Sequence, residues 1–156
     1  MHNIWVRNAR EEDAKNFTQW FVKMPSFTKE LFEFPSTYIL CAFNPKILAY
    51  GVVSFGQETQ VLSRVVVNPE VTLLEQAGAS KEIVKSVITI GYLNGQKEIY
   101  FMGDNPGTNR IAQHVFEKIE YPEYKHVFGA SDYPIYRLKL NSLEHSEEEN
   151  GKQSIR

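Results

Sequence analysis

Cysteine and histidine are scarce in this chain. Cys41 is the only cysteine among 156 residues, so no disulfide can form within the chain and no metal site can use two cysteines. The four histidines are scattered, without the close spacing typical of metal ligands, at His2, His114, His126 and His145. We therefore expect no metal site, and a redox or metal enzyme is disfavoured.

Long apolar runs and an excess of positive charge are also lacking. No stretch approaches the roughly 18 apolar residues of a membrane-spanning helix. The start, MHNIWVRNAREED, lacks the apolar run of a signal peptide, so we expect a cytoplasmic protein. The net charge is -2, and residues 1–140 carry fifteen acidic and fifteen basic side chains. Such a balance offers no basic footprint, so neither nucleic acid nor a membrane is an expected partner.

The chain does have the material for one hydrophobic core. Hydrophobic residues make up 42% and aromatic residues 13% of the sequence, with only nine glycines and seven prolines. Its length fits a single domain. We expect one domain over residues 1–140, followed over 141–156 by an acidic tail that is poor in apolar residues and mobile.

The N-terminal part predicts a strand followed by helices. Ile4–Val6 has a short strand signal, and the acids at Glu11–Asp13 suit the start of a helix that runs to Met24. Phe17, Trp20, Phe21 and Met24 recur at steps of three and four residues along it. Residues 27–34 predict a short second helix or an aromatic loop.

Three β-rich runs follow and predict a meander. Tyr38–Phe43 and Ile47–Phe55 flank Asn44-Pro45-Lys46, whose proline and asparagine are typical of a hairpin turn. A third run, Thr59–Val67, is expected to pair antiparallel with the second, because sequential strands joined by short loops usually pair.

The remaining elements alternate between helix and strand. Ser80 as N-cap and Asn94-Gly95 as terminator bound a helix, and Ile99–Met102 predicts a short buried strand. Apolar residues from Ile111 to Ile119 have helical spacing. Two closing strands are predicted at Tyr124–Phe128 and Ile135–Leu140.

Two segments have a distinctive pattern of residues. VVVNPE (65–70) leads through LLEQAGAS (73–80) into a helix, with Val67-Asn68-Pro69 followed by Glu75, Gly78 and Ser80. NRIAQHVFEKIEY (109–121) combines Asn109 and Ala112 with Glu117, Lys118 and Tyr121. Together with the order of elements, these segments resemble the GNAT superfamily of acyl-CoA N-acyltransferases. The chain departs from the family pattern at Glu75, where Gln or Arg is usual, and at Phe116, where Tyr is usual. It also departs at Ser80, where Gly or Ala is usual, at Glu120, where Gly is usual, and in a longer loop after Pro69.

The resemblance implies a fold and a co-substrate. The fold would be a mixed α/β domain in three layers (α/β/α), with about four helices and a central mixed, mostly antiparallel sheet of about seven strands. The co-substrate would be acetyl-CoA. Its expected binding residues are Val65, Val66, Val67, Glu75, Gln76, Ala77, Gly78, Ala79, Ser80, Asn109, Ala112 and Phe116.

Physical reasoning supports part of this assignment. A loop at Ala77–Ala79 before a helix would present backbone N–H groups to a diphosphate at the positive end of the helix dipole. Gly78 would permit close approach, although shaping a tight entry to the helix would also explain it. Asn109 could equally cap its helix, and Phe116 could equally be a core residue.

The catalytic groups are harder to assign. Transfer to an amine needs a base that removes a proton, because an ammonium with a pKa near ~10.4 is protonated at neutral pH. Thr59–Val67 contains no acid. Glu58 and Tyr121 are weak candidates, alongside Glu33, Asp104, Tyr124 and His126. Catalysis by positioning alone is the alternative.

The sequence thus predicts an acetyl-CoA-dependent N-acetyltransferase that acts on a primary amine of a small molecule or peptide. The aromatic residues between Trp20 and Tyr38 are expected either in the core or along the cleft for the amine. The alternative is a degenerate GNAT-like domain that binds acyl-CoA or a protein partner without catalysis. A homodimer is left open.

Overall fold

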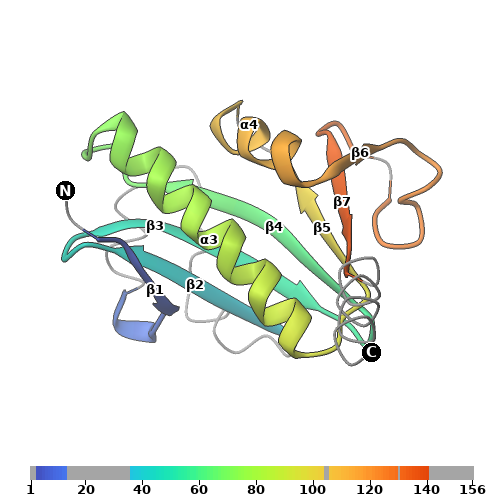
Figure 1. The fold of residues 1–156 in the computed structure, drawn as a ribbon, viewed down its shortest axis with the longest axis horizontal. Helices are drawn as coiled ribbons and strands as arrows, with labels where there is room; N and C mark the ends of the chain where they lie inside the picture. Colours follow the sequence, from blue (N-terminus) through green and yellow to red (C-terminus); the bar gives the residue numbers. More distant parts are fainter. Residues whose placement is uncertain (1–2, 14–35, 104–105, 130, 141–156) are drawn as a thin grey trace, which may run out of the picture.

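The computed structural model describes residues 3–13, 36–103, 106–129 and 131–140. Its elements follow one another along the chain as strands, a 3-10 turn (η1) and α-helices (Figure 1). In order they are β1 (Trp5–Asn8), η1 (Glu11–Asp13), β2 (Thr37–Phe43), β3 (Ile47–Phe55), β4 (Thr59–Val67), α3 (Leu73–Leu93), β5 (Glu98–Met102), α4 (Pro106–Val115), β6 (Glu117–Ile119) and β7 (Ile135–Lys139).

All seven strands belong to one sheet, in the order β1-β2-β3-β4-β5-β7-β6. Five of the neighbouring pairs are antiparallel, and β4 and β5 are parallel. Parallel neighbours need a long crossover, which α3 provides. The predicted mixed, mostly antiparallel sheet of about seven strands is confirmed.

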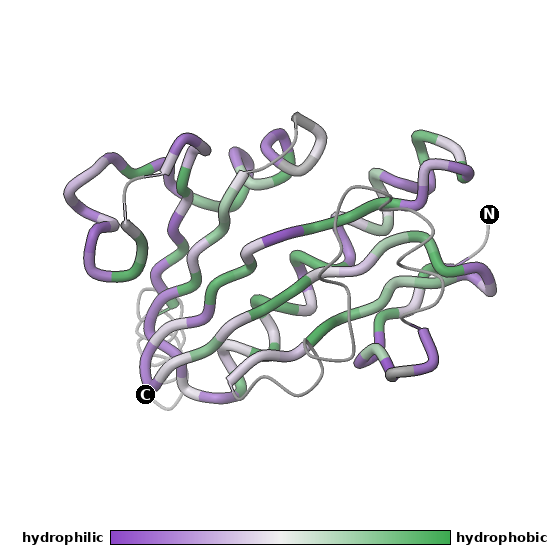
Figure 2. The backbone as a smooth tube through the Cα atoms, turned by 180° about the vertical axis from the view of Figure 1, so that it is seen from behind, coloured by the Kyte–Doolittle hydropathy of each residue, from purple (hydrophilic) through white to green (hydrophobic). Residues whose placement is uncertain are grey.

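The central meander has the predicted hairpin and pairing. β2 and β3 flank the turn at residues 44–46, and β3 pairs antiparallel with β4 through Gly51↔Val65 and its neighbours. Gly51 allows close packing of α3, because a Cβ at this position would lie 2.7 Å from Ile83 Cγ2. Hydrophobic residues run along these central strands, as the tube in Figure 2 shows.

Helices α3 and α4 cover one face of the sheet (Figure 1). The main core lies beneath them and includes Leu62 and Val65 of β4, Ile83 and Val87 of α3, and Ala112 of α4. On the other face, Tyr50 and Val66 belong to one cluster, and Tyr100, Tyr124 and Ile135 to another. No described helix is long and apolar enough to cross a membrane.

The number of helices differs from the prediction of about four. The described residues contain two α-helices, and Glu11–Asp13, the start of a predicted helix, forms a 3-10 turn. Asp13 closes this turn by accepting from Arg10 N at 2.7 Å and from Arg7 Nη1 at 2.7 Å. The rest of that helix, the element at 27–34 and the tail lie outside the described residues.

Helix α3 begins eight residues before the predicted start, so the prediction of Ser80 as N-cap was wrong. Thr72 is the N-cap, and its Oγ1 accepts from Glu75 N at 3.1 Å. The Glu75 carboxylate accepts from Thr72 N at 3.2 Å, which completes a capping box. Ser80 lies inside the helix, where its hydroxyl donates to Gln76 O at 3.0 Å. At the other end the prediction is confirmed, since Asn94 is the C-cap and Gly95 has φ +71°.

The segment after α4 also differs from its prediction. The helix ends at Val115, and Glu117–Ile119, expected to be helical, form β6 with Ile119↔Ile135 in register. Residues 121–127 form turns where a strand at Tyr124–Phe128 was predicted. Val127 N and Phe128 N both bond to Tyr124 O, at 3.0 and 2.9 Å. The apolar residues of this segment therefore pack on β5 and β7 from a turn.

Candidate active site

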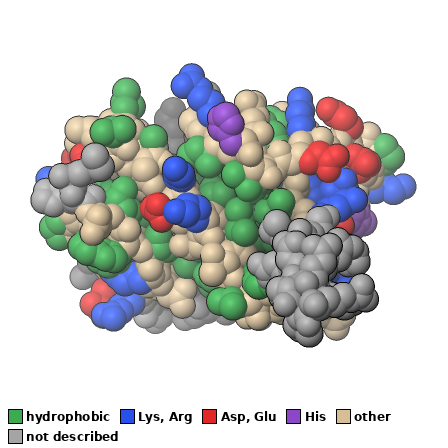
Figure 3. Space-filling view, in the orientation of Figure 1, with side chains coloured by type: hydrophobic (Ala, Val, Ile, Leu, Met, Phe, Trp, Pro, Cys, Tyr) green, Lys and Arg blue, Asp and Glu red, His purple; other side chains and the backbone are tan. Residues whose placement is uncertain are grey.

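The candidate site begins where the two parallel strands separate. Their register runs from Thr59↔Glu98 to Leu62↔Phe101 and ends there, while β4 continues in register with β3 to Ala49↔Val67. Figure 1 shows β4 and β5 side by side at their starts and diverging towards α4. The carboxyl ends of parallel strands in an α/β sheet are a common place for a ligand to bind. Hydrophobic side chains gather over this region between α3 and α4 (Figure 3).

A β-bulge at Ser63 lies at the same point of β4. The register with β3 passes from Val53↔Leu62 to Val52↔Arg64 and leaves Ser63 as the extra residue. Leu62 and Val65 consequently face the same core, although a regular strand would place residues three apart on opposite faces. Bulges bend a strand and are frequent next to active sites. Sequence reasoning missed Ser63, whose only signal is this odd spacing of buried apolar residues.

The three valines predicted to bind acetyl-CoA lie beyond this bulge. Val65 is buried in the core beneath α3, and Val66 is buried in the cluster on the opposite face. Val67 is partly buried and packs against the first core. The segment predicted to bind acetyl-CoA is therefore the part of β4 that has separated from β5.

Asn109 faces the end of β5 from the first turns of α4. Its Oδ1 is buried and has no hydrogen-bond partner among the described residues. It lies against Gly103, where an added Cβ would be 1.6 Å from Asn109 Oδ1. A buried acceptor without a partner is costly, which makes this atom a candidate for a ligand's N–H or O–H group. Sequence reasoning missed Gly103, although glycine directly after a strand is a signal of close approach.

Ala112 and Phe116 lie beside the same strand end. Ala112 is fully buried, and Phe116, just after α4, is 6% exposed. The Phe116 ring packs on Phe101, the last residue of β5 in register with β4, with ring centroids 6.1 Å apart. Phe116 is thus a core residue whose position adjoins the separation of the strands.

The segment from Glu75 to Ser80 is a stretch of helix, so the predicted loop at Ala77–Ala79 was wrong. Gly78 lies inside α3, and a Cβ at residue 78 would lie 3.0 Å from Ile4 Cδ1. Its small size therefore serves the approach of β1 to the helix. Gln76 instead holds the preceding loop, since its Nε2 donates to Asn68 O at 3.0 Å and to Val71 O at 3.2 Å.

The two weak catalytic candidates do not lie together. Glu58 precedes β4 at the end where the parallel strands are paired, and it forms an ion pair with Lys97 at 2.8 Å. Four residues of strand, about 13 Å, separate Glu58 from Leu62. Tyr121 is 56% exposed in the turn segment, with its ring 5.7 Å from that of Tyr124. Neither residue is fixed at the separation of the strands.

A polar cluster lies on the face opposite α3. The Tyr100 hydroxyl donates to Glu98 Oε2 at 2.5 Å and lies 3.1 Å from His126 Nε2. Burial, followed by the bond to Glu98, raises the pKa of Tyr100 above its ordinary value, so its hydroxyl stays protonated. Glu98 is paired with Thr59 at the closed end of the parallel strands, and Tyr100 is paired with Val61, one residue before their last pair. The cluster is therefore set apart from the candidate site by the face of the sheet on which it lies.

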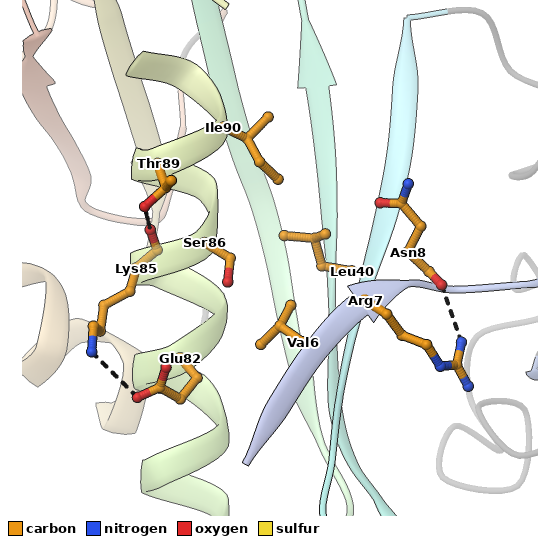
Figure 4. A pocket seen from close by; sticks show the side chains of 9 residues that line it. All are labelled: Val6, Arg7, Asn8, Leu40, Glu82, Lys85, Ser86, Thr89 and Ile90. Atoms are coloured by element: carbon orange, nitrogen blue, oxygen red, sulfur yellow. Dashed lines mark hydrogen bonds and ion pairs between the residues drawn. The ribbon is translucent and has the colours of Figure 1, made fainter. Parts of the chain in front are cut away.

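A cavity of about 440 Å³ lies between α3 and the sheet edge formed by β1 and β2 (Figure 4). Val6, Leu40 and Ile90 provide apolar side chains, and the ion pair of Lys85 with Glu82 lies on the helix side. None of the residues predicted to bind acetyl-CoA lines it.

Solved structures share this arrangement. A GNAT-family acetyltransferase from Staphylococcus aureus Mu50 is 13% identical, with 88% of this chain and 99% of that chain covered and a TM-score of 0.70. One from Elizabethkingia anophelis with acetyl-CoA bound is 16% identical over 88% and 99% of the chains, at a TM-score of 0.62. This chain has the GNAT fold. No family model and no curated protein matches the sequence.

A condensation domain, which is not named as an acetyltransferase, also has a similar fold. The C-terminal condensation domain of Ebony, in complex with β-alanyl-dopamine, is 8% identical over 89% of this chain and 100% of that domain, with a TM-score of 0.65. Because the fold is shared at such low identity, the activity has to be argued from the residues of this chain.

Proposed function

We propose that this protein is an acyl-CoA-dependent acetyltransferase that transfers an acetyl group from acetyl-CoA to a primary amine of a small molecule or peptide. The observation that carries the proposal is the separation of β4 and β5 after Leu62↔Phe101, with the buried Asn109 Oδ1 beside it, which no described residue contacts by a hydrogen bond. The GNAT-fold acetyltransferase that contains acetyl-CoA supports the choice of co-substrate.

The roles follow from where each residue lies. The backbone of Val65–Val67, beyond the bulge, would bind the amides of the pantetheine arm. Asn109 Oδ1 would accept a hydrogen bond from one of the arm's donors, which would satisfy a buried acceptor that has no partner in the described part of the chain. Ala112, small and buried, would let α4 pack close to the strand end, and Phe116, which packs on Phe101, would support the strand end beneath the thioester.

The reaction forms an N–C bond and breaks a C–S bond. The neutral amine attacks the thioester carbon, the carbonyl oxygen carries the negative charge of the intermediate, and a backbone N–H near the bulge would stabilise it. The thiolate then leaves and takes up a proton, while the amine loses one. Since Phe116 has no hydroxyl, we propose that water protonates the thiolate and that catalysis depends mainly on positioning.

The test is a calorimetric titration with acetyl-CoA, followed by an amine panel read by release of free thiol. Binding together with thiol release that depends on the amine supports the proposal. Absence of heat at several temperatures, with unchanged melting at saturating acetyl-CoA, contradicts it.

A second candidate is a domain that binds an acyl thioester without turnover. Two observations favour it, the absence of a hydroxyl at Phe116 and the carboxylate of Glu75 at the start of α3. Binding without thiol release from any amine would select this candidate over the enzyme.

A further inference from the structure

The first turn of α3 carries its own negative charge. Glu75 Oε1 accepts from Thr72 N at 3.2 Å and from Thr72 Oγ1 at 2.9 Å, and Glu75 Oε2 accepts from Asn44 Nδ2 at 3.2 Å. These hydrogen bonds, with that from Asn44 the largest contribution, hold the pKa of Glu75 below its ordinary value. The side chain is therefore an anchored carboxylate at neutral pH.

This carboxylate lies at the helix end that would otherwise attract a diphosphate. The N-terminus of a helix favours an anion because its first amides and its dipole present positive charge. Here Thr72 satisfies the amides of Glu75 and Gln76, through its Oγ1 and its carbonyl oxygen respectively. Residues 77–80 are inside the helix, so their amides do not form an anion-binding loop.

The residues around Glu75 do not make this end of α3 positively charged. Leu73 and Leu74, in the same turn, are 81% and 79% exposed and present apolar side chains to solvent. Lys46, on the β2–β3 turn, is near enough to contribute to the lowered pKa of Glu75, and it offsets one negative charge at most. A diphosphate brought to this end of α3 would meet a fixed carboxylate and two leucines.

We propose that Glu75 is a specificity-determining residue that makes this protein recognise its donor by the acylated pantetheine arm and disfavour the nucleotide diphosphate of CoA. The donor class is an acyl-pantetheine thioester, whether it comes as CoA or on another carrier. This inference rests on the proposed function, because the arm must bind between β4 and β5. Unlike the proposed function alone, the inference assigns no favourable contact to the diphosphate of CoA.

The experiment compares the dissociation constants of acetyl-CoA and acetyl-pantetheine, which has no phosphate, by calorimetry. For the natural sequence we expect the two values to agree within about threefold. Glu75→Gln keeps a capping box, since glutamine can take the same position, and removes the charge. It should tighten acetyl-CoA at least fivefold at low salt and leave acetyl-pantetheine unchanged within twofold.

Glu82→Gln is the matched control. It removes one negative charge from the same helix seven residues further on, about 10 Å along the axis, and should change neither constant by more than twofold. A tenfold or greater preference of the natural protein for acetyl-CoA would overturn the inference. An unchanged ratio of the dissociation constants of acetyl-CoA and acetyl-pantetheine in a folded Glu75→Gln protein would also overturn it. If neither thioester binds, the proposed function fails, and this inference falls with it.

Discussion

Gly103 and Asn109 approach each other so closely that only glycine fits at residue 103. A Cβ there would lie 1.6 Å from Asn109 Oδ1 and 2.7 Å from Asn109 Cγ, so the asparagine would have to move. The contact joins the end of β5 to α4 at the point where β5 leaves β4. The position of Asn109 in the candidate site therefore depends on the absence of a side chain at residue 103.

Gly103→Ala should displace Asn109 and weaken acetyl-CoA binding at least tenfold. Overpacking of this kind also costs about 1–3 kcal/mol in the free energy of unfolding. Gly129→Ala is the control, since a Cβ there would meet nothing within 4 Å. Calorimetry and urea denaturation measure the two effects. Unchanged affinity in the folded Gly103→Ala protein would remove Asn109 from the binding site.

Asn109→Ala separates binding from stability at the same place. Its Oδ1 is already buried without a partner among the described residues, so removing it should not lower the free energy of unfolding. Alanine is also the better helix former inside α4. We expect unchanged or higher melting together with at least a fivefold loss of acetyl-CoA affinity. A loss of stability above about 1 kcal/mol would instead give Asn109 a structural role.

Two glycines of α3 should respond in opposite ways to the same substitution. Gly78→Ala adds a methyl that meets only the mobile end of the Ile4 side chain at 3.0 Å, and alanine gains about 0.5–1 kcal/mol inside a helix. Gly91→Ala places the methyl 2.5 Å from Gln60 Nε2 and 2.9 Å from Ile99 Cδ1, both in the buried core. Thermal unfolding should show a rise for Gly78→Ala and a fall for Gly91→Ala. A fall for Gly78→Ala would show that β1 is held too tightly against α3 to adjust.

The ion pair between Arg7 and Asp13 should make stability depend on pH in the acid range. Hydrogen bonds from Arg7 hold the pKa of Asp13 below its ordinary value of 3.8. The contribution is therefore complete above about pH 4, where the unfolded carboxyl is ionised, and is lost as the pH falls through the lower folded pKa. Asp13→Asn should destabilise the protein at pH 7 and progressively less towards pH 2 in urea titrations. A difference independent of pH would contradict this assignment.

Much of the fold could be predicted because local sequence patterns determine many of its strands and helix ends. β4 runs over Thr59–Val67 as predicted, and α3 ends at Asn94 and Gly95, because strand alternation and a terminating glycine are local signals. The start of α3 was missed because Leu73 and Leu74 face solvent and add nothing to an apolar stripe. The signal that could have found it is the Thr72-x-x-Glu75 capping box.

The candidate site likewise has some features that local sequence indicates and others that only the tertiary structure shows. Asn109, Ala112 and Phe116 could be predicted as candidates from the sequence, because all three belong to one short segment, and their role in binding stays a prediction. The bulge at Ser63 and the contact of Gly103 with Asn109 needed the tertiary structure. A bulge is defined by the count of residues between two paired strands. The lack of room for a Cβ at residue 103 arises only when α4 packs on the end of β5. A sequence specifies side chains and local preferences, whereas the separation of β4 from β5 is set by how the whole sheet packs against α3 and α4.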